Sequence, residues 1–200
     1  PLFPEVSIQE MVQACKQAVH SLVDNKRLSR YILFGDSVGG FLASHVTAHR
    51  IAHQLSLPER LYLLSPLIKH TFSIDKKAVK PKCKTDDILG PVYELVTNNE
   101  RVRLDSTRKL GCADVNDLCA INPEALAQFP VVHITYDRDE VLLWEIQEWT
   151  KQLKKLGVKL VDNSVDNGFH AFAVYSYLPM SKQYFSEISR DFQKLLQKKT

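Results

Sequence analysis

The stretch from residue 31 to residue 40, Tyr-Ile-Leu-Phe-Gly-Asp-Ser-Val-Gly-Gly, constrains this chain more than any other. Its first four residues are apolar or aromatic and predict a short buried strand. The pattern Gly-x-Ser-x-Gly follows, and residues 41–50 then carry apolar side chains at helical spacing. A strand, a tight turn and a helix in this order can hold a reactive serine on a sharp turn. The stretch therefore makes Ser37 a candidate nucleophile.

The glycines of this turn have a physical reason to be there. Because Gly35 and Gly39 lack a Cβ atom, we expect both to let the strand and the helix come close together. The N–H groups at the start of the helix would then be directed at an oxyanion beside Ser37. The alternative is an ordinary glycine-rich strand–helix turn with an incidental serine.

Further strand and helix patterns alternate along the chain. Ser7 and Glu10 form a capping box that predicts the start of a first amphipathic helix, within residues 4–25. Asn122 and Pro123 cap a short helix in the same way. The other expected strands are at 60–66, 130–136 and 158–161. The other expected helices are the one that follows Ser37 and ends near residue 54, and those at 143–156 and 181–198. This alternation predicts an α/β fold, a mostly parallel sheet with helices on both faces.

Residues 69–118 have a looser pattern and interrupt this alternation. We interpret them as a lid-like insertion over the strand ends, within one domain that covers residues 1–200. Its apolar residues would wall a substrate pocket or pack in the core. They are Phe72, Ile88, Leu89, Val92, Tyr93 and Leu95. The alternative is a surface excursion without a function.

Three chemically useful side chains follow predicted strands. Ser37 follows the first, Asp137 or Asp139 follows the third, and His170 lies in a glycine-containing loop after the fourth. Parallel strands end at one edge of a sheet, so these side chains can meet there. A serine hydroxyl needs an imidazole to take its proton, and the imidazole needs a carboxylate to orient it. The alternative for His170 is a histidine that hydrogen-bonds only within its loop.

Composition excludes several other classes of function. The formal net charge of +3 comes without a basic stripe interleaved with aromatic residues, so nucleic acid is not an expected partner. His45, His49 and His53 share one helix face without an evident third ligand, so we expect no metal site there. The four cysteines form no Cys-x-x-Cys pair, which favours reduced thiols in an intracellular, cytoplasmic protein. Since the chain begins at Pro1 and not at Met, an upstream signal or anchor stays open.

These motifs together resemble those of the α/β-hydrolase superfamily and, within it, the hormone-sensitive-lipase-like esterases. Residues 35–40 resemble its GDSAGG elbow, residues 64–66 its strand that ends in Ser-Pro, residues 139–143 its acid-bearing segment, and residues 169–172 the segment around its catalytic histidine. The resemblance implies an α/β-hydrolase fold and hydrolysis of carboxylic esters without metal or cofactor. It implies Ser37, Asp139 and His170 as the catalytic triad, with Asp139 chosen over Asp137, and Val38 as an oxyanion donor through its backbone N–H.

The sequence departs from this family in one large respect. The family carries an upstream His-Gly-Gly motif that supplies further oxyanion donors, and these 200 residues contain no such segment. We therefore expect the N-terminal strands of the sheet to be missing, and an N-terminal half of the same hydrolase to be a partner. The predicted activity is a serine esterase that acts through an acyl-enzyme. The alternatives are an amidase or formamidase on the same fold, or a non-catalytic binding protein.

Overall fold

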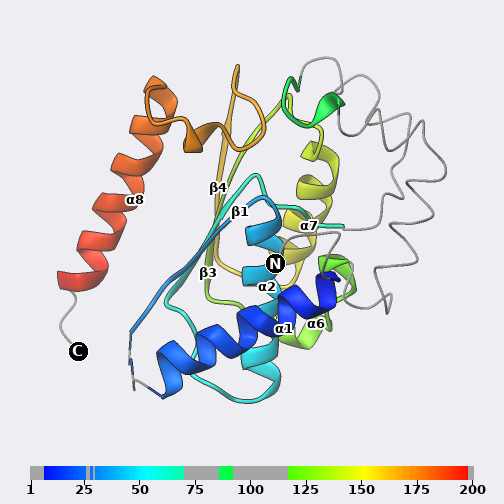
Figure 1. The fold of residues 1–200 in the computed structure, drawn as a ribbon, viewed down its shortest axis with the longest axis vertical. Helices are drawn as coiled ribbons and strands as arrows, with labels where there is room; N and C mark the ends of the chain where they lie inside the picture. The colour runs from blue at the N-terminus through cyan, green and yellow to red at the C-terminus, as the bar shows by residue number, and fades with distance from the viewer. Residues whose placement is uncertain (1–6, 26–27, 29, 70–85, 92–116, 198–200) are drawn as a thin grey trace. The chain divides into compact units, whose positions relative to one another are not determined.

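A computed structural model describes residues 7–25, 28, 30–69, 86–91 and 117–197 (Figure 1). The chain divides into two compact units, Pro1–His170 and Ala171–Thr200. The first unit contains the sheet and every predicted site residue. Of the predicted insertion, only its two ends and residues 86–91 lie among the described residues.

Among the described residues, the first unit contains a four-stranded parallel sheet. Its strands are β1 (Leu33–Asp36), β2 (Arg60–Leu64), β3 (Val131–Asp137) and β4 (Leu160–Val165), and they lie in the order β1-β2-β3-β4. Sequence order and spatial order are therefore the same in the described sheet. All four strands end at one edge, as predicted, and the loops that follow them lie together there.

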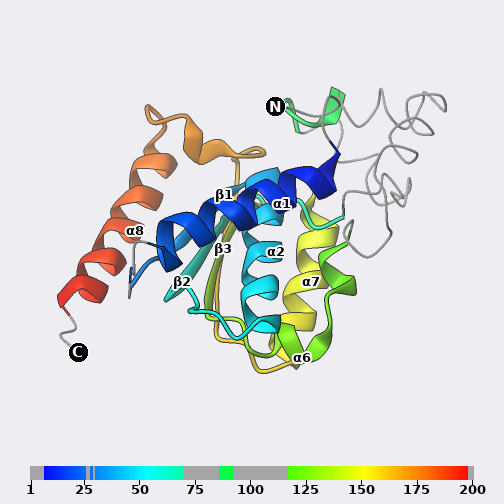
Figure 2. The ribbon, with the colours of Figure 1, turned by 60° about the horizontal axis from the view of Figure 1, so that its bottom comes forward.

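Helices α1, α2 and α7 lie on the same side of this sheet (Figures 1 and 2). The described helices of the first unit are α1 (Ile8–Val19), which continues in a π-helical turn (His20–Asp24), α2 (Val38–Ala52), the 3-10 turn η4 (Leu118–Ala120), α6 (Pro123–Leu126) and α7 (Leu143–Lys155). The two predicted caps are confirmed. Ser7 and Glu10 form the capping box of α1, and Asn122 caps α6 with Pro123 in its first turn.

The core lies between the sheet and these helices. Its fully buried side chains come mainly from the two central strands and from the inner faces of α1, α2 and α7. They include Ile8, Phe41, Leu61, Leu63, Val132, Ile134, Ile146, Trp149 and Leu153. Burial of such side chains is the main favourable term in folding. It fixes the sheet on which the candidate site is built.

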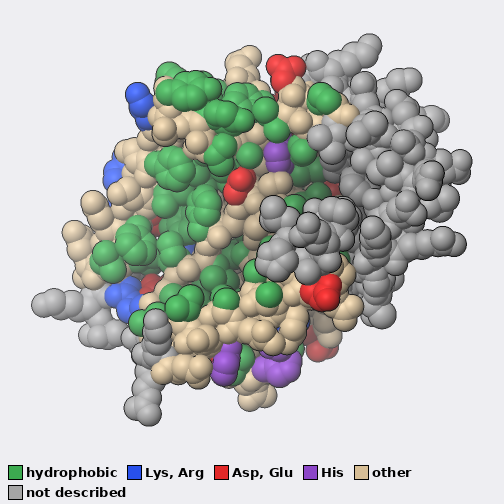
Figure 3. Space-filling model, viewed as in Figure 1, with side chains coloured by type: hydrophobic (Ala, Val, Ile, Leu, Met, Phe, Trp, Pro, Cys, Tyr) green, Lys and Arg blue, Asp and Glu red, His purple; other side chains and the backbone are tan. Residues whose placement is uncertain are grey.

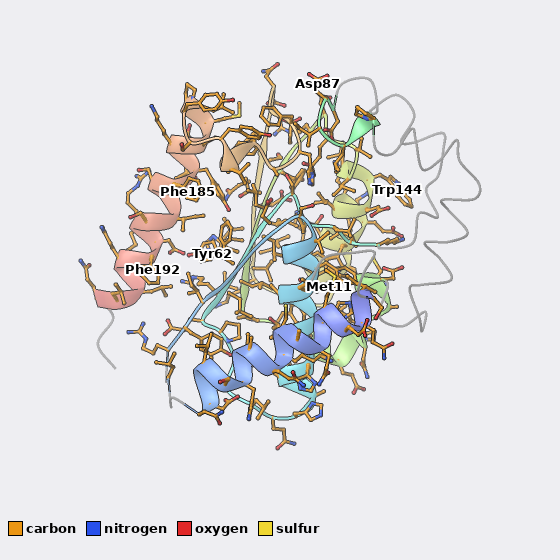
Figure 4. The ribbon with its side chains drawn as sticks, viewed as in Figure 1. Met11, Tyr62, Asp87, Trp144, Phe185 and Phe192 are labelled. Atoms are coloured by element: carbon orange, nitrogen blue, oxygen red, sulfur yellow. The ribbon has the colours of Figure 1, made fainter. Side chains whose placement is uncertain are left out.

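The second unit consists of the 3-10 turn η5 (Phe172–Val174) and helix α8 (Pro179–Gln197). Ser181 donates its hydroxyl proton to the carbonyl oxygen of Phe172 at 2.9 Å, which holds the turn against the helix. Phe185 and Phe192 project from one side of α8 (Figure 4), and both are exposed. Hydrophobic side chains are visible along this helix in the space-filling view (Figure 3).

The predicted apolar wall falls largely outside the described residues, because Phe72, Val92, Tyr93 and Leu95 are not among them. Ile88 is exposed, while Leu89 packs against the core. None of the helices in the described part of the chain is apolar over a length that could cross a membrane.

Candidate active site

Ser37 stands on a strained turn between β1 and α2. Its backbone has φ 53° and ψ −117°, a positive φ that non-glycine residues rarely adopt. The Ser37 N–H donates to the carbonyl oxygen of Leu64 at 2.9 Å, and its own carbonyl oxygen accepts from the N–H of Leu67 at 3.0 Å. These two hydrogen bonds hold the turn to the end of β2. The predicted elbow is therefore present, with the strain that such a turn requires.

The glycines of the elbow do not all have the predicted role. A Cβ atom on Gly35 would lie 2.3 Å from the carbonyl oxygen of Gly39, and one on Gly40 would lie 2.8 Å from the Cβ of Pro66. A Cβ atom on Gly39 would meet nothing within 4 Å. The close approach of strand and helix therefore requires glycine at Gly35 and at Gly40. The expectation for Gly39 was wrong, because its missing side chain would face open space.

His170 lies beside Ser37, although 133 residues separate them in the sequence. The Nε2 atom of His170 is 2.9 Å from the Oγ atom of Ser37, and His170 is 3% exposed. If Nε2 is the unprotonated ring nitrogen, it accepts the hydroxyl proton of Ser37. The loop after β4 and the elbow after β1 thus bring together two of the predicted residues.

The carboxylate next to His170 belongs to Glu140. Its Oε2 atom is 3.7 Å from Nδ1 of His170 and accepts the hydroxyl proton of Ser65 at 2.7 Å. Glu140 is fully buried, and this burial raises its pKa, while His170 and Ser65 lower the pKa to a smaller extent. A separation of 3.7 Å fits an ion pair but is longer than a hydrogen bond. Nδ1 of His170 has no hydrogen-bond partner among the described residues.

Asp137 and Asp139, the two candidate acids from the sequence, have contacts other than the His170 imidazole. Asp139 has an exposed side chain, and its N–H donates to Oδ1 of Asp137 at 2.7 Å. Asp137 is fully buried, and its Oδ2 atom accepts from the N–H of Gly168 at 2.7 Å. Asp137 thus joins the turn after β3 to the loop that carries His170. The structure brings Glu140 to the imidazole in the place predicted for Asp139, because the turn directs residue 139 outward and residue 140 inward.

Val38 and Asp36 flank the serine. Val38 is the first residue of α2, so its N–H has no acceptor within the helix and is available to an oxyanion. Burial raises the pKa of Asp36, and the nearby His170 lowers it to a smaller extent. The Oδ1 atom of Asp36 is buried and has no hydrogen-bond partner among the described residues.

The histidine face of α2 lies in a different setting. His45 is buried, and its ring centre is 4.5 Å from that of Phe41, while the ring centres of His49 and His53 are 4.0 Å apart with the rings tilted. Within the described residues, no group of His, Cys, Asp and Glu side chains has the arrangement of a metal site. His45 therefore has a packing role in the core.

Sequence reasoning missed Glu140 and Ser65 as members of the site. Glu140 stands immediately before the apolar run Val141-Leu142-Leu143, which signals that the chain turns inward there. Ser65 occupies a buried position with φ 42° at the end of β2, and positive φ at a buried serine is not readable from the sequence. Both residues become visible only when the strand ends are placed side by side.

Comparisons with known proteins agree with this fold. A family model described as alpha/beta hydrolase fold matches residues 1–174. An esterase/lipase from an uncultured bacterium has a TM-score of 0.78 at 23% identity and covers 96% of this chain and 62% of its own. Carboxyl esterase 2 from the mycorrhizal fungus Tuber melanosporum has a TM-score of 0.74 at 21% identity, with 97% and 65% covered. A hormone-sensitive lipase from a metagenome library has a TM-score of 0.76 at 19% identity, with 97% and 64% covered.

These solved structures share the fold of this chain and are longer. The chain spans less than two thirds of the length of each. A search of curated proteins gave no match. The family model covers most of the chain, and the parallel sheet flanked by helices agrees with the fold that it describes. The chain belongs to the alpha/beta hydrolase fold family.

Proposed function

We propose that this chain is the catalytic part of a serine hydrolase that cleaves carboxylic esters through an acyl-enzyme. The observation that carries the proposal is the 2.9 Å separation of Ser37 Oγ and His170 Nε2 on a strained elbow. A serine on such a turn exposes its hydroxyl and has its proton acceptor already in place. The solved structures that share the fold include enzymes named as esterases and lipases, which supports esters as the substrate class.

The proposed reaction follows from the positions of these groups. Ser37 Oγ attacks the ester carbonyl while His170 Nε2 takes the hydroxyl proton, and the alcohol leaves with that proton. The backbone N–H of Val38 donates to the oxyanion that forms at the carbonyl oxygen. Water then attacks the acyl-enzyme, again with His170 as the base, and releases the carboxylic acid.

We assign the orienting carboxylate to Glu140 in this proposal. Its Oε2 atom lies 3.7 Å from His170 Nδ1, a distance that can shorten when the imidazole becomes positively charged. Catalytic hydrogen bonds are often long without substrate and tighten in the transition state. Asp139, the acid expected from the sequence, is the alternative, and paired variants of the two residues separate them.

We further propose that the working hydrolase includes strands beyond these 200 residues, placed against β1. β1 is the end strand of the described sheet, and Phe34 within it is 46% exposed. Successive residues of a strand point their N–H groups to alternate sides. Since Ser37 donates toward β2, the N–H groups of Phe34 and Asp36 point away from it. An edge that no described strand covers invites pairing with another strand.

An intact-mass measurement on the protein from its source cells tests this second proposal. We expect a chain heavier than 22.8 kDa, or a second polypeptide bound to it. Amide exchange at Phe34 and Asp36 should be slow in that species and fast in the 200 residues alone. A free 22.8 kDa monomer with slow exchange at both amides contradicts the proposal.

A fluorophosphonate probe tests the ester-hydrolase proposal directly. We expect it to label Ser37, and the Ser37→Ala variant to lose both labelling and p-nitrophenyl ester hydrolysis, by roughly 10⁴-fold or more. The matched control is another hydroxyl variant, Ser44→Ala, because within the described part of the chain the Ser44 hydroxyl donates to the carbonyl oxygen of Gly40 on its own helix. Absence of labelling in the protein isolated from its source favours a non-catalytic binding protein. Faster cleavage of the matching anilide favours an amidase.

A further inference from the structure

A third buried carboxylate, that of Asp86, reaches the turn that carries Glu140. Asp86 is 1% exposed, and its Oδ2 atom accepts from the N–H of Val141 at 3.0 Å. Its Oδ1 atom accepts from the N–H groups of Ile88 at 3.1 Å and Leu89 at 2.9 Å. One side chain therefore binds its own segment and the end of a turn that lies 55 residues further along the chain.

The hydrogen bond from Val141 to Asp86 acts next to Glu140. Val141 directly follows Glu140, so a hydrogen bond to its N–H fixes the peptide that bears the Glu140 side chain. The segment 86–91 lies beside the N-terminal end of α7 (Figure 1). Among the described residues the structure gives Asp86 no cationic partner, so its hydrogen bonds to backbone N–H groups account for its placement. A buried carboxylate that accepts three such bonds is satisfied without an ion pair.

The same turn is held at its other end by Asp137. The carboxylate of Asp137 accepts the N–H groups of Asp139 and Gly168, both at 2.7 Å. Two carboxylates from different parts of the chain thus fix the start and the end of a five-residue turn. Glu140 lies between them, and its orientation follows from both.

We propose that Asp86 is a positioning residue, which holds the turn at Val141 so that the Glu140 carboxylate faces His170. This inference rests on the proposed function, since it concerns the acid of the proposed triad. It goes further by assigning a role to the segment 86–91, whose sequence carries no catalytic motif. That segment becomes part of the support of the active site.

The negative charge of Asp86 gives the proposal a second, electrostatic readout. Burial and three side chains set the pKa of Glu140. Burial raises it most, His170 and the Ser65 hydroxyl lower it, and the charge of Asp86 raises it again. We expect the acid limb of the rate profile to follow the ionisation of Glu140. Removing the charge of Asp86 should therefore move that limb to lower pH.

The experiment compares Asp86→Asn and Asp86→Ala with the control Asp87→Asn in the full chain. Asp87 is the exposed neighbour on the same segment (Figure 4). We expect Asp86→Ala to lower kcat for a p-nitrophenyl ester roughly 10²-fold, because misplacing a catalytic group by about 1 Å has an effect of this size, with KM changed less than threefold. Asp86→Asn keeps one acceptor oxygen, so it should lose less activity and shift the acid limb to lower pH. Asp87→Asn should do neither.

A measurement without substrate separates this inference from the proposed function. We expect the Val141 amide to exchange with solvent much faster in Asp86→Ala than in the wild type or in Asp87→Asn. If the wild type shows no hydrolysis that depends on Ser37, the proposed function fails. The exchange rate of the Val141 amide still shows whether Asp86 holds the turn. If Asp86→Ala is too unstable, Asp86→Asn decides through its pH profile. The inference is overturned if the Asp86 variants keep the kcat, the acid limb of the pH profile and the Val141 amide exchange rate of the wild type.

Discussion

Glu140, just before α7, and Glu145, in its first turn, are both buried but have different surroundings. Glu140 is 0% exposed and Glu145 is 6% exposed, and burial raises the pKa of both. Glu140 faces the imidazole of His170 and the hydroxyl of Ser65. Glu145 accepts the backbone N–H of Lys69 at 3.2 Å. A raised pKa therefore does not by itself mark a carboxylate as functional. The groups that each carboxylate faces are what distinguish Glu140 from Glu145.

The surroundings of Glu145 are those of a structural cluster. Lys69 pairs with Glu148 at 2.8 Å and lies 3.9 Å from Asp117. Its ammonium group is 5.3 Å from the ring centre of Trp144, which Figure 4 shows at the start of α7. These contacts join the start of the predicted insertion to α7. Unlike the contacts of Glu140, these contacts include neither a serine hydroxyl nor an imidazole.

The largest expected difference between the two glutamates is in activity. Glu140→Gln should lower kcat/KM by roughly 10²–10⁴-fold, because the imidazolium loses its carboxylate. Glu145→Gln should change kcat/KM less than threefold. Asp139→Asn is the second control and should also have little effect. Steady-state ester hydrolysis measures all three, and a large loss in Asp139→Asn with activity retained in Glu140→Gln would return the acid to Asp139.

The second difference is in stability against pH. Burial raises the pKa of Glu145 from 4.5 to about 7, so the folded protein holds a proton there that the unfolded chain releases above pH 4.5. The free energy of unfolding therefore falls as pH rises from 4.5 to 7, by about 3 kcal/mol at most. Urea titrations across this range should show the decline in the wild type and a flatter curve in Glu145→Gln. The same slope in both proteins would contradict the assignment.

A smaller effect, on the pH dependence of activity, is expected from Ser65. Its hydroxyl donates to Glu140 and favours the ionised carboxylate. Ser65→Ala should raise the pKa of Glu140 and move the acid limb of kcat/KM to higher pH, by an amount worth about 1–2 kcal/mol. This shift is opposite in direction to the one expected for Asp86→Asn. A pH profile of kcat/KM for each variant measures this shift. A shift in the same direction in both variants would contradict the roles assigned to Ser65 and Asp86.

The smallest effect is expected at an exposed ion pair next to the same turn. Arg138 binds Asp166 at 2.7 Å, and their side chains are 54% and 61% exposed. Arg138→Ala should reduce the free energy of unfolding by less than about 1 kcal/mol, because exposed ion pairs are weak. It should leave kcat/KM unchanged. Thermal unfolding and an ester assay check both statements, and a large loss of activity would show that the turn depends on surface charge.

The sequence by itself determined the features that depend on neighbouring residues. The steric demand at Gly35 comes from a backbone only a few residues away, and the capping box of Ser7 and Glu10 closes within one turn of helix. The alternation of apolar runs with amphipathic helices was enough to predict the parallel sheet. Strands that end at one edge then brought Ser37 and His170 together, as expected from their places after β1 and β4.

Only the tertiary structure decided which carboxylate meets His170. Residues 137, 139 and 140 follow the same strand, and their sequence does not say which side chain points inward. That choice depends on hydrogen bonds from Asp137 to the loop at Gly168 and from Asp86 to Val141. Both join parts of the chain that are far apart in sequence. A local pattern therefore cannot encode the orientation of the turn, whereas the packed fold fixes it.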